Sequence, residues 1–449
     1  MISAEQNRRL TQVGSATPGG KLLRHYWHPV ALTDELDAFD ETVSRPVIPV
    51  RLLGQDLVLF RDDTGQLGLL DRDCPHRGAD LSYGRLEDGG LRCSFHGWLF
   101  DRSGRCLETP GEPAGSRLCD RVRQRAYPVV ERNGAIFAWL GEQSPADLPP
   151  LDCFTAPESH VFAFKGLWRC NWLQAQEVGI DPAHASFLHR FYNDGDPEES
   201  YGQQFRGASA NSEMAMTQVL RQYEQPEIQV KAMPFGLQLT SLRRLGDHQT
   251  HVRVTNGVFP NGIVLPMSET MTLSQWHVPI DDTHTYWFAM FTSFTEPVDK
   301  QAMRDQRMAM HQLPDYAPLT SADNRYGFNA ADQKNRTYTG MGEDINVHDQ
   351  WAVESPGAIA DRTREHLGTT DIAIMANRRN LLKAIQAVEQ AEAPPGYMGV
   401  TQMGPDSGPI TMDGVCESAD AQTIADFATR IDQERRDKAP WLETNGEPA

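Results

Sequence analysis

Short runs of apolar residues, separated by polar turn residues, mark the first third of the chain. Gly54-Gln55 and residues 62–65 stand between such runs, as hairpin turns stand between strands. This pattern predicts a β-rich unit between residue 47 and about residue 140. Its strand candidates are residues 50–53, 56–60, 67–70 and 134–140, with a further turn at 101–104.

The sequences on either side of this unit do not have the strand pattern. Upstream, residues 2–12 have the spacing of a short amphipathic helix, and residues 21–36 lead into the first strands. Downstream, four prolines between 145 and 157 interrupt the pattern, and proline resists both helix interiors and central strands. We therefore predict a domain boundary near residue 145.

Two periodicities alternate in the remainder of the chain. Helical spacing at 171–178 and 371–388 predicts helices, of which the longer covers a sheet. The residues after about 394 contain scattered Pro, Gly and acidic groups, so we expect them to wrap the surface in part or to be loosely ordered. Alternation typical of antiparallel strands is present at 214–223, 228–233, 236–242, 251–258 and 285–294.

These elements predict an α+β protein. We expect an N-terminal extension at 1–45, an all-β domain at 46–145 and a third domain at 146–449. In the third domain, helices cover an antiparallel sheet in an arrangement of the helix-grip type.

Composition narrows the class of protein. With 449 residues, 39% hydrophobic and 23% charged, the chain has the balance of a soluble globular protein. The net charge of −19 argues against nucleic acid as a partner. We see no apolar run long enough to span a membrane and no secretory signal, and therefore expect a cytoplasmic location. Seven cysteines without pairing rhythm favour reduced thiols over disulfides.

The first candidate metal site combines Cys74-Pro-His76 with Cys93-Ser-Phe-His96. Two thiolates and two imidazoles are the ligands of a Rieske [2Fe-2S] cluster. The alternative is a structural zinc site, which also uses two Cys and two His. Zinc fingers mostly place a Cys pair before a His pair, whereas each loop here offers one of each, so the Rieske interpretation is favoured.

The second candidate site contains His184 and His189. With one carboxylate they would form the facial triad of a non-haem iron, which leaves positions open for dioxygen. We expect Asp181 to cap a helix with Pro182 at its first position, which places the two imidazoles about 140° apart around it. Two such histidines are more often structural, but a Rieske-type cluster in the same chain reverses that prior. The carboxylate candidates are Glu343, Asp344, Asp349 and Asp361.

The motif Cys74-Pro-His76-Arg-Gly78 and the following His96-Gly97-Trp98 resemble the Rieske domain of aromatic-ring-hydroxylating oxygenases. Segments 171–189 and 361–371 are similar to the phthalate 4,5-dioxygenase-like group of that family. The resemblance covers most of residues 1 to about 390, and the substrate-binding stretch between about 200 and 330 is its least specific part.

The resemblance implies roles for individual residues. It favours Asp349 as the third iron ligand at a helix start, against the alternative of a carboxylate stabilised by the helix macrodipole. It also implies that Asp181 joins His184 of one chain to His96 of the adjacent subunit, so that electrons cross between subunits. A closed homo-oligomer follows, most simply a head-to-tail trimer or a multiple of it.

Three further residues have open roles. Glu177 stands where many ring-hydroxylating relatives carry Asn, and it either tunes the iron pocket electrostatically or is a satisfied polar residue. Arg243 and Arg244 are candidates for binding a substrate carboxylate, which a guanidinium grips with two hydrogen bonds. The alternative for each arginine is a surface salt bridge.

The resulting hypothesis is the oxygenase component of a multicomponent Rieske oxygenase. It contains a [2Fe-2S] cluster and a mononuclear Fe(II), uses O2 and hydroxylates an aromatic substrate, expected to be an aromatic carboxylate, by cis-dihydroxylation. Since we find no G-x-G-x-x-G motif after a strand, electrons must come from a separate NADH-dependent reductase with flavin and an iron–sulfur centre. The acidic chain favours a basic face on that donor.

Two alternatives remain. The same iron site would also serve monooxygenation, such as O-demethylation of a methoxylated aromatic acid. A different class of protein, an electron-transfer Rieske protein or a zinc-stabilised binding module, would not need an iron triad in some 300 further residues.

Overall fold

The computed structural model describes residues 1–37, 46–193, 209–394, 408–418, 420–439 and 441–442. The chain begins with two short helices, α1 (Ala4–Thr11) and α2 (Pro18–Leu23). Ser3 caps α1 because its hydroxyl accepts a hydrogen bond from the backbone N–H of Gln6. The side-chain oxygen of Gln6 in turn accepts one from the backbone N–H of Ser3. The predicted N-terminal helix is therefore confirmed.

The N-terminal β domain consists of three small antiparallel sheets, ordered β1-β10-β9, β2-β3-β4 and β5-β6-β7-β8. The strand candidates at 50–53, 56–60, 67–70 and 134–140 are confirmed as β2, β3, β4 and β10. The strands are β1 (Trp27–Leu32), β2 (Val47–Leu52), β3 (Gln55–Arg61), β4 (Leu67–Asp71), β5 (Arg85–Glu87), β6 (Gly90–Arg92), β7 (Leu99–Phe100), β8 (Cys106–Glu108), β9 (Val129–Arg132) and β10 (Ala135–Trp139).

The division at residues 45 and 145 stays a prediction. β1 lies in the expected N-terminal extension, yet it is hydrogen-bonded to β10 over its whole length, from Trp27 opposite Trp139 to Leu32 opposite Ala135. This pairing ties the start of the chain to the β domain.

A large antiparallel sheet forms the C-terminal domain. Its strand order is β11-β17-β16-β15-β14-β13-β12, and β20 pairs with β14 beside that path. The strands predicted at 228–233, 236–242, 251–258 and 285–294 are confirmed as β12, β13, β14 and β17. The strands are β11 (Val161–Trp168), β12 (Glu227–Met233), β13 (Gly236–Arg244), β14 (Thr250–Val258), β15 (Gly262–Ser268), β16 (Met271–Pro279), β17 (Thr285–Ser293) and β20 (Met412–Cys416).

The strand predicted at 214–223 is wrong. This segment contains helix α7 (Met216–Gln222). Met216, Thr217 and Leu220 all line one cavity, and positions i, i+1 and i+4 share a face only on a helix. The alternation of the segment had suggested a strand, but a helical face accounts for the positions that line the cavity.

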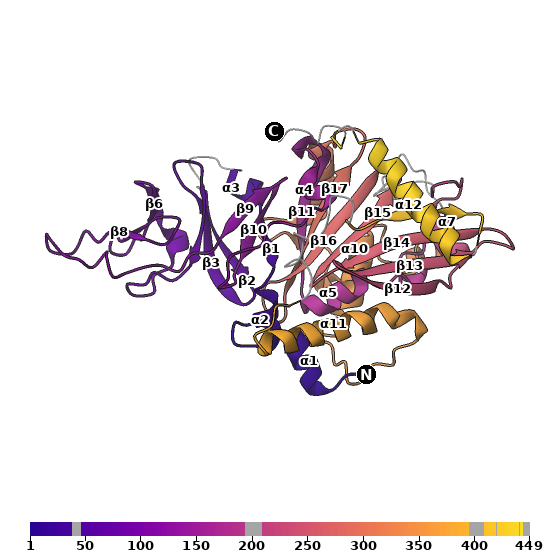
Figure 1. Ribbon diagram of the computed structural model, residues 1–449, viewed down its shortest axis with the longest axis horizontal. Helices are drawn as coiled ribbons and strands as arrows, with labels where there is room; N and C mark the ends of the chain where they lie inside the picture. Colours follow the sequence, from indigo (N-terminus) through magenta and orange to yellow (C-terminus); the bar gives the residue numbers. More distant parts are fainter. Residues whose placement is uncertain (38–45, 194–208, 395–407, 419, 440, 443–449) are drawn as a thin grey trace.

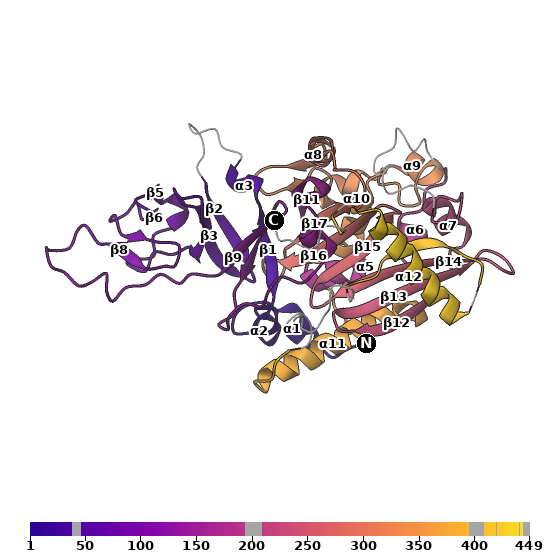
Figure 2. The same cartoon turned by 45° about the horizontal axis from the view of Figure 1, so that its top comes forward.

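Helices cover both faces of the sheet (Figures 1 and 2). The long helix α11 (Ile372–Glu389) packs near β12 and β13, which confirms the helix predicted at 371–388. Its Ala373 shares a core with Leu239, whereas helix α12 (Ala421–Asp437) packs on Leu242. Because residues 239 and 242 point to opposite faces of β13, the two helices lie on opposite sides. Strand β20 and α12 show that the expectation of a loosely ordered C-terminal part was incomplete.

The two domains share one hydrophobic core. Phe137 of β10 contacts Phe154 of helix α4 (Asp152–Thr155) and Trp276 of β16, with ring centroids 5.1 and 5.5 Å apart. Such aromatic packing fixes the angle between the domains. The loops between β4 and β8 project away from the large sheet in both views (Figures 1 and 2). In the described part of the chain, no helix has both the length and the apolar character needed to cross a membrane.

Candidate functional site

Two matching loops carry the first set of predicted ligands. In one, Gly78 donates its backbone N–H to the carbonyl of Cys74 (2.8 Å), and in the other Gly97 donates to the carbonyl of Cys93 (2.9 Å). Both glycines have φ near +75°, a conformation that glycine adopts without steric cost. The loops therefore turn back in the same way and present their Cys and His side chains to a common space.

The thiols and the imidazoles occupy different sides of that space. Cys74 and Cys93 are buried, with 2% and 3% of their surface exposed. The rings of His76 and His96 lie 4.5 Å apart by centroid, and His96 is exposed to solvent. Trp98 stacks on His76 at 4.3 Å. The four predicted cluster ligands are thus brought together, with sulfur inside and nitrogen outside.

The thiol pair fits a bound cation. Burial, together with the neighbouring Cys93, raises the pKa of Cys74 to about 11, against the lowering effect of the backbone N–H groups of His76 and Arg77. Two adjacent thiolates are therefore unfavourable unless positive charge binds them. The Cys₂His₂ donor set matches the [2Fe-2S] cluster of a Rieske centre.

The second predicted set also converges, although from different local structure than expected. Helix α6 (Ala185–Leu188) has only one turn, with His184 before it and His189 after it. Asp181 does not begin this helix: its Oδ1 accepts the backbone N–H of Ala183 at 2.8 Å. That local hydrogen bond forms a turn in place of the predicted cap.

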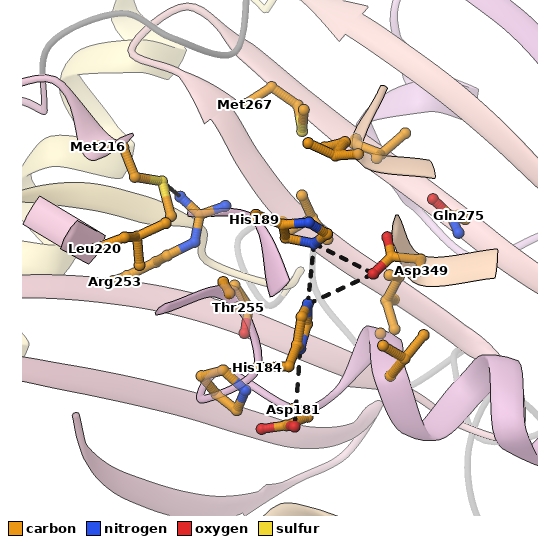
Figure 3. A pocket seen from close by; sticks show the side chains of 18 of the residues that line it. Asp181, His184, His189, Met216, Leu220, Arg253, Thr255, Met267, Gln275 and Asp349 are labelled. Carbon is orange, nitrogen blue, oxygen red and sulfur yellow. Dashed lines mark hydrogen bonds and ion pairs between the residues drawn. The ribbon is translucent and has the colours of Figure 1, made fainter. Parts of the chain in front are cut away.

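Three ligand atoms form a small triangle on one side of the cavity (Figure 3). His184 Nε2 lies 3.2 Å from His189 Nε2, and Asp349 Oδ1 lies 3.2 Å from His189 Nε2 and 3.8 Å from His184 Nε2. Adjacent ligands of an octahedral ion with bonds of about 2.1 Å are about 3.0 Å apart. The triangle therefore fits one face of such an ion, and it is the one grouping of His, Cys, Asp and Glu ligand atoms of this kind among the described residues.

Burial and neighbouring charges shift the pKa values of His184 and Asp349 in the direction that metal binding needs. Burial lowers the pKa of His184, and charge on His189 lowers it further. Burial would raise the pKa of Asp349, but His189 and His184 outweigh it and hold that pKa below its ordinary value. Neutral imidazoles beside an ionised carboxylate are the binding form of a 2-His-1-carboxylate site.

Helix α10 (Ile345–Glu354) supplies Asp349, and Asp344 caps that helix. Asp349 is the fifth residue of α10, beyond the first turn where a macrodipole acts on a carboxylate. The other carboxylate candidates bind different partners: Glu343 lines the cavity but pairs with Arg336 at 2.5 Å, and exposed Asp361 caps its own turn by binding Thr363. Of the four candidates, Asp349 alone faces both histidines.

Asp181 lies behind the triad. Its Oδ2 is 3.8 Å from His184 Nδ1, the ring nitrogen that points away from the triangle (Figure 3). The side chain of Asp181 is 20% exposed. It therefore lies beside His184 and also lines the cavity.

Glu177 does not line the cavity. It belongs to helix α5 (Trp172–Gly179), and its carboxylate accepts hydrogen bonds from Arg362 (3.0 Å) and Arg378 (2.5 Å). All three side chains are buried. This geometry supports the interpretation of Glu177 as a satisfied polar residue.

The cavity beside the triad has a volume of about 240 Å³ and a mainly apolar wall, to which Leu220, Ile263 and Leu265 contribute. Arg243 lines it and is 1% exposed. Arg244 points the other way, as neighbours on a strand do, and pairs with Glu227 at 3.7 Å while half exposed. The sequence did not distinguish the two arginines as candidates for substrate binding. The structure places only Arg243 in the cavity wall.

Sequence reasoning missed Arg253, His277 and Gln275. Arg253 lines the cavity and donates to Asp413 at 2.7 Å. It is paired across β13–β14 with Ser241, two residues from Arg243 on the same face. Residue parity on the predicted strand at 251–258 was the signal that could have found it.

A chain of hydrogen bonds orients the opposite wall. Gln176 donates to the carbonyl of Gly262 (3.1 Å), so its Oε1 accepts from His277 Nδ1 (2.9 Å). His277 Nε2 then accepts from Gln275 (3.0 Å), a cavity residue near Asp349 (Figure 3). Burial lowers the pKa of His277 to about 3, so this histidine is neutral and the direction of the chain is defined.

Comparison with known proteins agrees with both sites. Residues 26–128 match the Rieske [2Fe-2S] domain, and residues 138–420 match the family described as LigXa C-terminal domain like. The chain is a Rieske oxygenase component. It is 34% identical over 408 residues to the phthalate 4,5-dioxygenase oxygenase subunit of Pseudomonas putida, covering 88% of each chain. It is 32% identical to the 5,5'-dehydrodivanillate O-demethylase oxygenase subunit of Sphingobium sp., covering 88% of this chain and 83% of the relative.

Solved structures show that this Rieske oxygenase has the fold of the family. Dicamba monooxygenase bound to dicamba aligns with a TM-score of 0.55 at 19% identity, covering 82% of this chain and 99% of the other. The terminal oxygenase of carbazole 1,9a-dioxygenase from Nocardioides aromaticivorans aligns with a TM-score of 0.53 at 19% identity, covering 87% and 97%. The α+β fold, with its β domain and helix-covered antiparallel sheet, is thus confirmed.

Proposed function

We propose that this chain is the terminal oxygenase of a multicomponent system that uses O2 and externally supplied electrons to hydroxylate an aromatic carboxylate. The observation that carries this proposal is the triangle of His184, His189 and Asp349, which opens onto an apolar cavity in a chain with a Rieske domain. Iron in that triangle would supply the activation of dioxygen.

Other residues would bind the cluster, exclude water and orient the iron ligands. Cys74 and Cys93 would hold one iron of the cluster, and His76 and His96 the other. The apolar wall would exclude water from the reacting ring, because it offers water few hydrogen bonds. Asp181 would orient the imidazole of His184 through Nδ1, as carboxylates do for metal-ligating histidines.

Arg243 supports a carboxylated substrate. Its guanidinium donates to the carbonyl of Tyr223 (3.0 Å) and to the hydroxyls of Ser241 (2.9 Å) and Ser186 (3.1 Å). Within the described residues it forms no ion pair, whereas Arg253 is neutralised by Asp413. Burial lowers the pKa of Arg243 to about 10, which keeps it charged at neutral pH. A buried cation without an ion pair among the described residues favours an anionic ligand.

We propose cis-dihydroxylation as the outcome. Similarity to a phthalate 4,5-dioxygenase subunit supports it, while similarity to an O-demethylase subunit keeps monooxygenation as the second candidate. Both reactions would use the same iron site. Turnover under ¹⁸O₂ distinguishes them, because dihydroxylation leaves two labelled oxygens on one ring and demethylation does not.

A homo-oligomer follows from where the two centres lie. The cluster loops project at one end of the chain, whereas α6 and α10, which carry the iron-site ligands, belong to the C-terminal domain (Figure 2). The exposed His96 is flanked by exposed Phe95 and Tyr83, and exposed Phe187 and Tyr338 lie beside the histidine segment of the iron site. Exposed aromatic residues are typical of interaction surfaces. We propose that the first patch of one subunit docks on the second patch of its neighbour in a head-to-tail trimer.

In that assembly, His96 of one subunit would reach Asp181 of the next, whose carboxylate lies 3.8 Å from His184 Nδ1 and whose side chain is 20% exposed. Electrons would enter the cluster from a separate NADH-dependent reductase. A cytoplasmic location and the division into residues 1–45, 46–145 and 146–449 belong to the same proposal.

The test combines metal analysis with product analysis. We expect about three irons and two acid-labile sulfides per chain from these ligand sets. A panel of aromatic acids and their methyl ethers, supplied with a surrogate reductase, should yield an oxygenated product by mass spectrometry. A preparation with two irons per chain and no oxygenated product would show an electron carrier instead.

A further inference from the structure

The charge around the cluster is opposite to the charge of the whole chain. Residues 72–125 contain ten arginines, no lysine and eight Asp or Glu residues, a net charge of +2, whereas the chain carries −19. Most acidic side chains of this segment form ion pairs with arginines of the same segment. Arg92 alone binds Glu87, Asp88 and Glu108, at 3.0, 3.0 and 2.8 Å.

Besides Arg77, whose guanidinium lies over the ring of Phe95 in the cluster loops, five arginines of this segment are exposed and form no ion pair with any described residue. We call them the arginine strip: Arg102, Arg105, Arg121, Arg123 and Arg125. Three of them, Arg121, Arg123 and Arg125, alternate along one segment. In an extended backbone, alternate side chains point to the same face. Gln124 is buried, and Val122 and Ala126 pack against the cluster-side core, so the odd-numbered residues from 121 to 125 point outward.

Arg105 and Arg123 face each other. They form an antiparallel bridge, and directly opposed residues on antiparallel strands project on the same side. Like charges in this position destabilise a pair of strands, and no described acidic side chain relieves them. An acidic partner surface would relieve the repulsion between these two arginines, so this surface is suited to bind a negatively charged partner.

The strip adjoins the cysteine side of the cluster. The Gln124 side chain donates to the carbonyls of Asp71 (2.5 Å) and Asp73 (2.8 Å), and Asp73 directly precedes Cys74. Cys106, next to Arg105, packs in one core with Cys74 and Cys93. The exposed His96 lies on the other side of the cluster, where the proposed neighbouring subunit would dock.

We propose that the arginine strip is the docking surface for the electron donor and that the donor presents an acidic [2Fe-2S] ferredoxin-type domain there. This rests on the proposed function, since it names the partner of the same cluster. The local charge reverses the expectation, drawn from the net charge of −19, that the donor has a basic face. Electrons would then enter beside the cysteines and leave through the histidines, so that donor and neighbouring subunit do not compete.

The test measures reduction of the cluster rather than product. An acidic plant-type [2Fe-2S] ferredoxin, reduced beforehand, is mixed anaerobically with the oxidised full-length holoprotein, and cluster absorbance is followed by stopped flow. We expect the rate to fall as ionic strength rises, because salt screens attraction between opposite charges. The double variant R121E/R123E should be reduced at least about tenfold more slowly at low salt, and R121Q/R123Q should lie between it and the wild type.

A matched control makes the same charge change elsewhere. Arg364 and Arg379 are exposed in the C-terminal domain, and R364E/R379E should be reduced at the wild-type rate. Dithionite should reduce the cluster of every variant equally, which excludes damage to the cluster. Equal rates for R121E/R123E and the control, or a rate that is insensitive to salt, would overturn the proposal.

The two proposals fail separately. Holoprotein reduced with dithionite and then given O2 and substrate reports on the proposed oxygenase function without any donor. Absence of product there would reject that function, while the stopped-flow result on the strip would stand.

Discussion

His184 and His189 bring their Nε2 atoms to within 3.2 Å of each other, although five positions separate them in the sequence. On a continuous helix their side chains would diverge by about 140°. The chain avoids this because α6 has one turn only, and each histidine lies at one of its ends. The backbone of His184 keeps helical angles (φ −57°, ψ −35°), whereas that of His189 departs from them (φ −103°, ψ 23°), and the two rings meet over Asp349.

Removal of the carboxylate ligand should empty the iron site selectively. In Asp349→Ala, two imidazoles remain, and we expect iron to fall from about three to about two atoms per chain while the two sulfides stay. Metal and sulfide analysis of the purified variant measures this. Glu343→Gln is the control, because Glu343 faces Arg336 and its variant should keep three irons. Loss of sulfide in Asp349→Ala would mean that the variant disturbs the whole chain.

Much of this site was predictable from the sequence, and the failures have identifiable causes. Cys74, His76, Cys93 and His96 stand in short motifs whose ligand types belong to one kind of cluster. The helix start at Asp181 was predicted wrongly because a side-chain hydrogen bond to Ala183 competes with capping. The sequence around Asp181 is compatible both with a helix cap and with this turn, so it cannot decide between them.

Features that depend on distant contacts were not predictable in detail. Arg243 and Arg244 are neighbours with the same chemistry, and only the pairing of β13 with β12 and β14 decides which one faces the cavity. β20 joins the sheet beside β14 from the far end of the chain. Its Asp413 neutralises Arg253 there, a relation that no spacing reveals.

Asp181→Asn tests the proposed path between subunits. The amide keeps the size of the side chain but removes the charge near His184 Nδ1. We expect both metal centres to stay loaded and turnover with reductase to fall by about 10- to 100-fold, in line with the effect of losing a carboxylate partner of a metal-ligating histidine. Stopped-flow reduction of the cluster should be unchanged, since it precedes this step. Full activity in the variant would remove the bridging role.

Glu177→Gln should act on stability. The carboxylate binds Arg362 and Arg378 in a buried cluster, and removing one partner of a buried ion pair costs about 3–5 kcal/mol. We therefore expect a lower melting temperature with iron content retained at low temperature. Glu343→Gln, which changes an acid outside this cluster, should melt like the wild type. A Glu177→Gln protein that melts normally but turns over slowly would instead support an electrostatic role at the iron.

Acid should destabilise the protein through His28. Burial lowers the pKa of this histidine to about 4, whereas in the unfolded chain it is about 6.5. Between these values only the unfolded state takes up the proton, so stability is present above pH 6.5 and is lost as the pH falls toward 4, by up to about 3 kcal/mol. In His28→Gln, the melting temperature should depend less steeply on pH between 7 and 5. His366→Gln, at an exposed position, should keep the wild-type slope.

Arg243 should decide between charged and uncharged substrates. Arg243→Gln removes the cation but retains donors for the Tyr223 carbonyl and the Ser241 hydroxyl. Loss of a buried partner for a carboxylate costs about 2–5 kcal/mol, so kcat/KM for an aromatic acid should fall by about 30-fold or more, mainly through KM. The methyl ester of the same acid should be affected far less, because it carries no charge for the guanidinium to bind. Arg244→Gln changes a half-exposed neighbour paired with Glu227 and should leave both substrates unchanged. An equal loss for acid and ester would show that Arg243 only holds the cavity in shape through its bond to Ser186, and the substrate would then need no carboxylate.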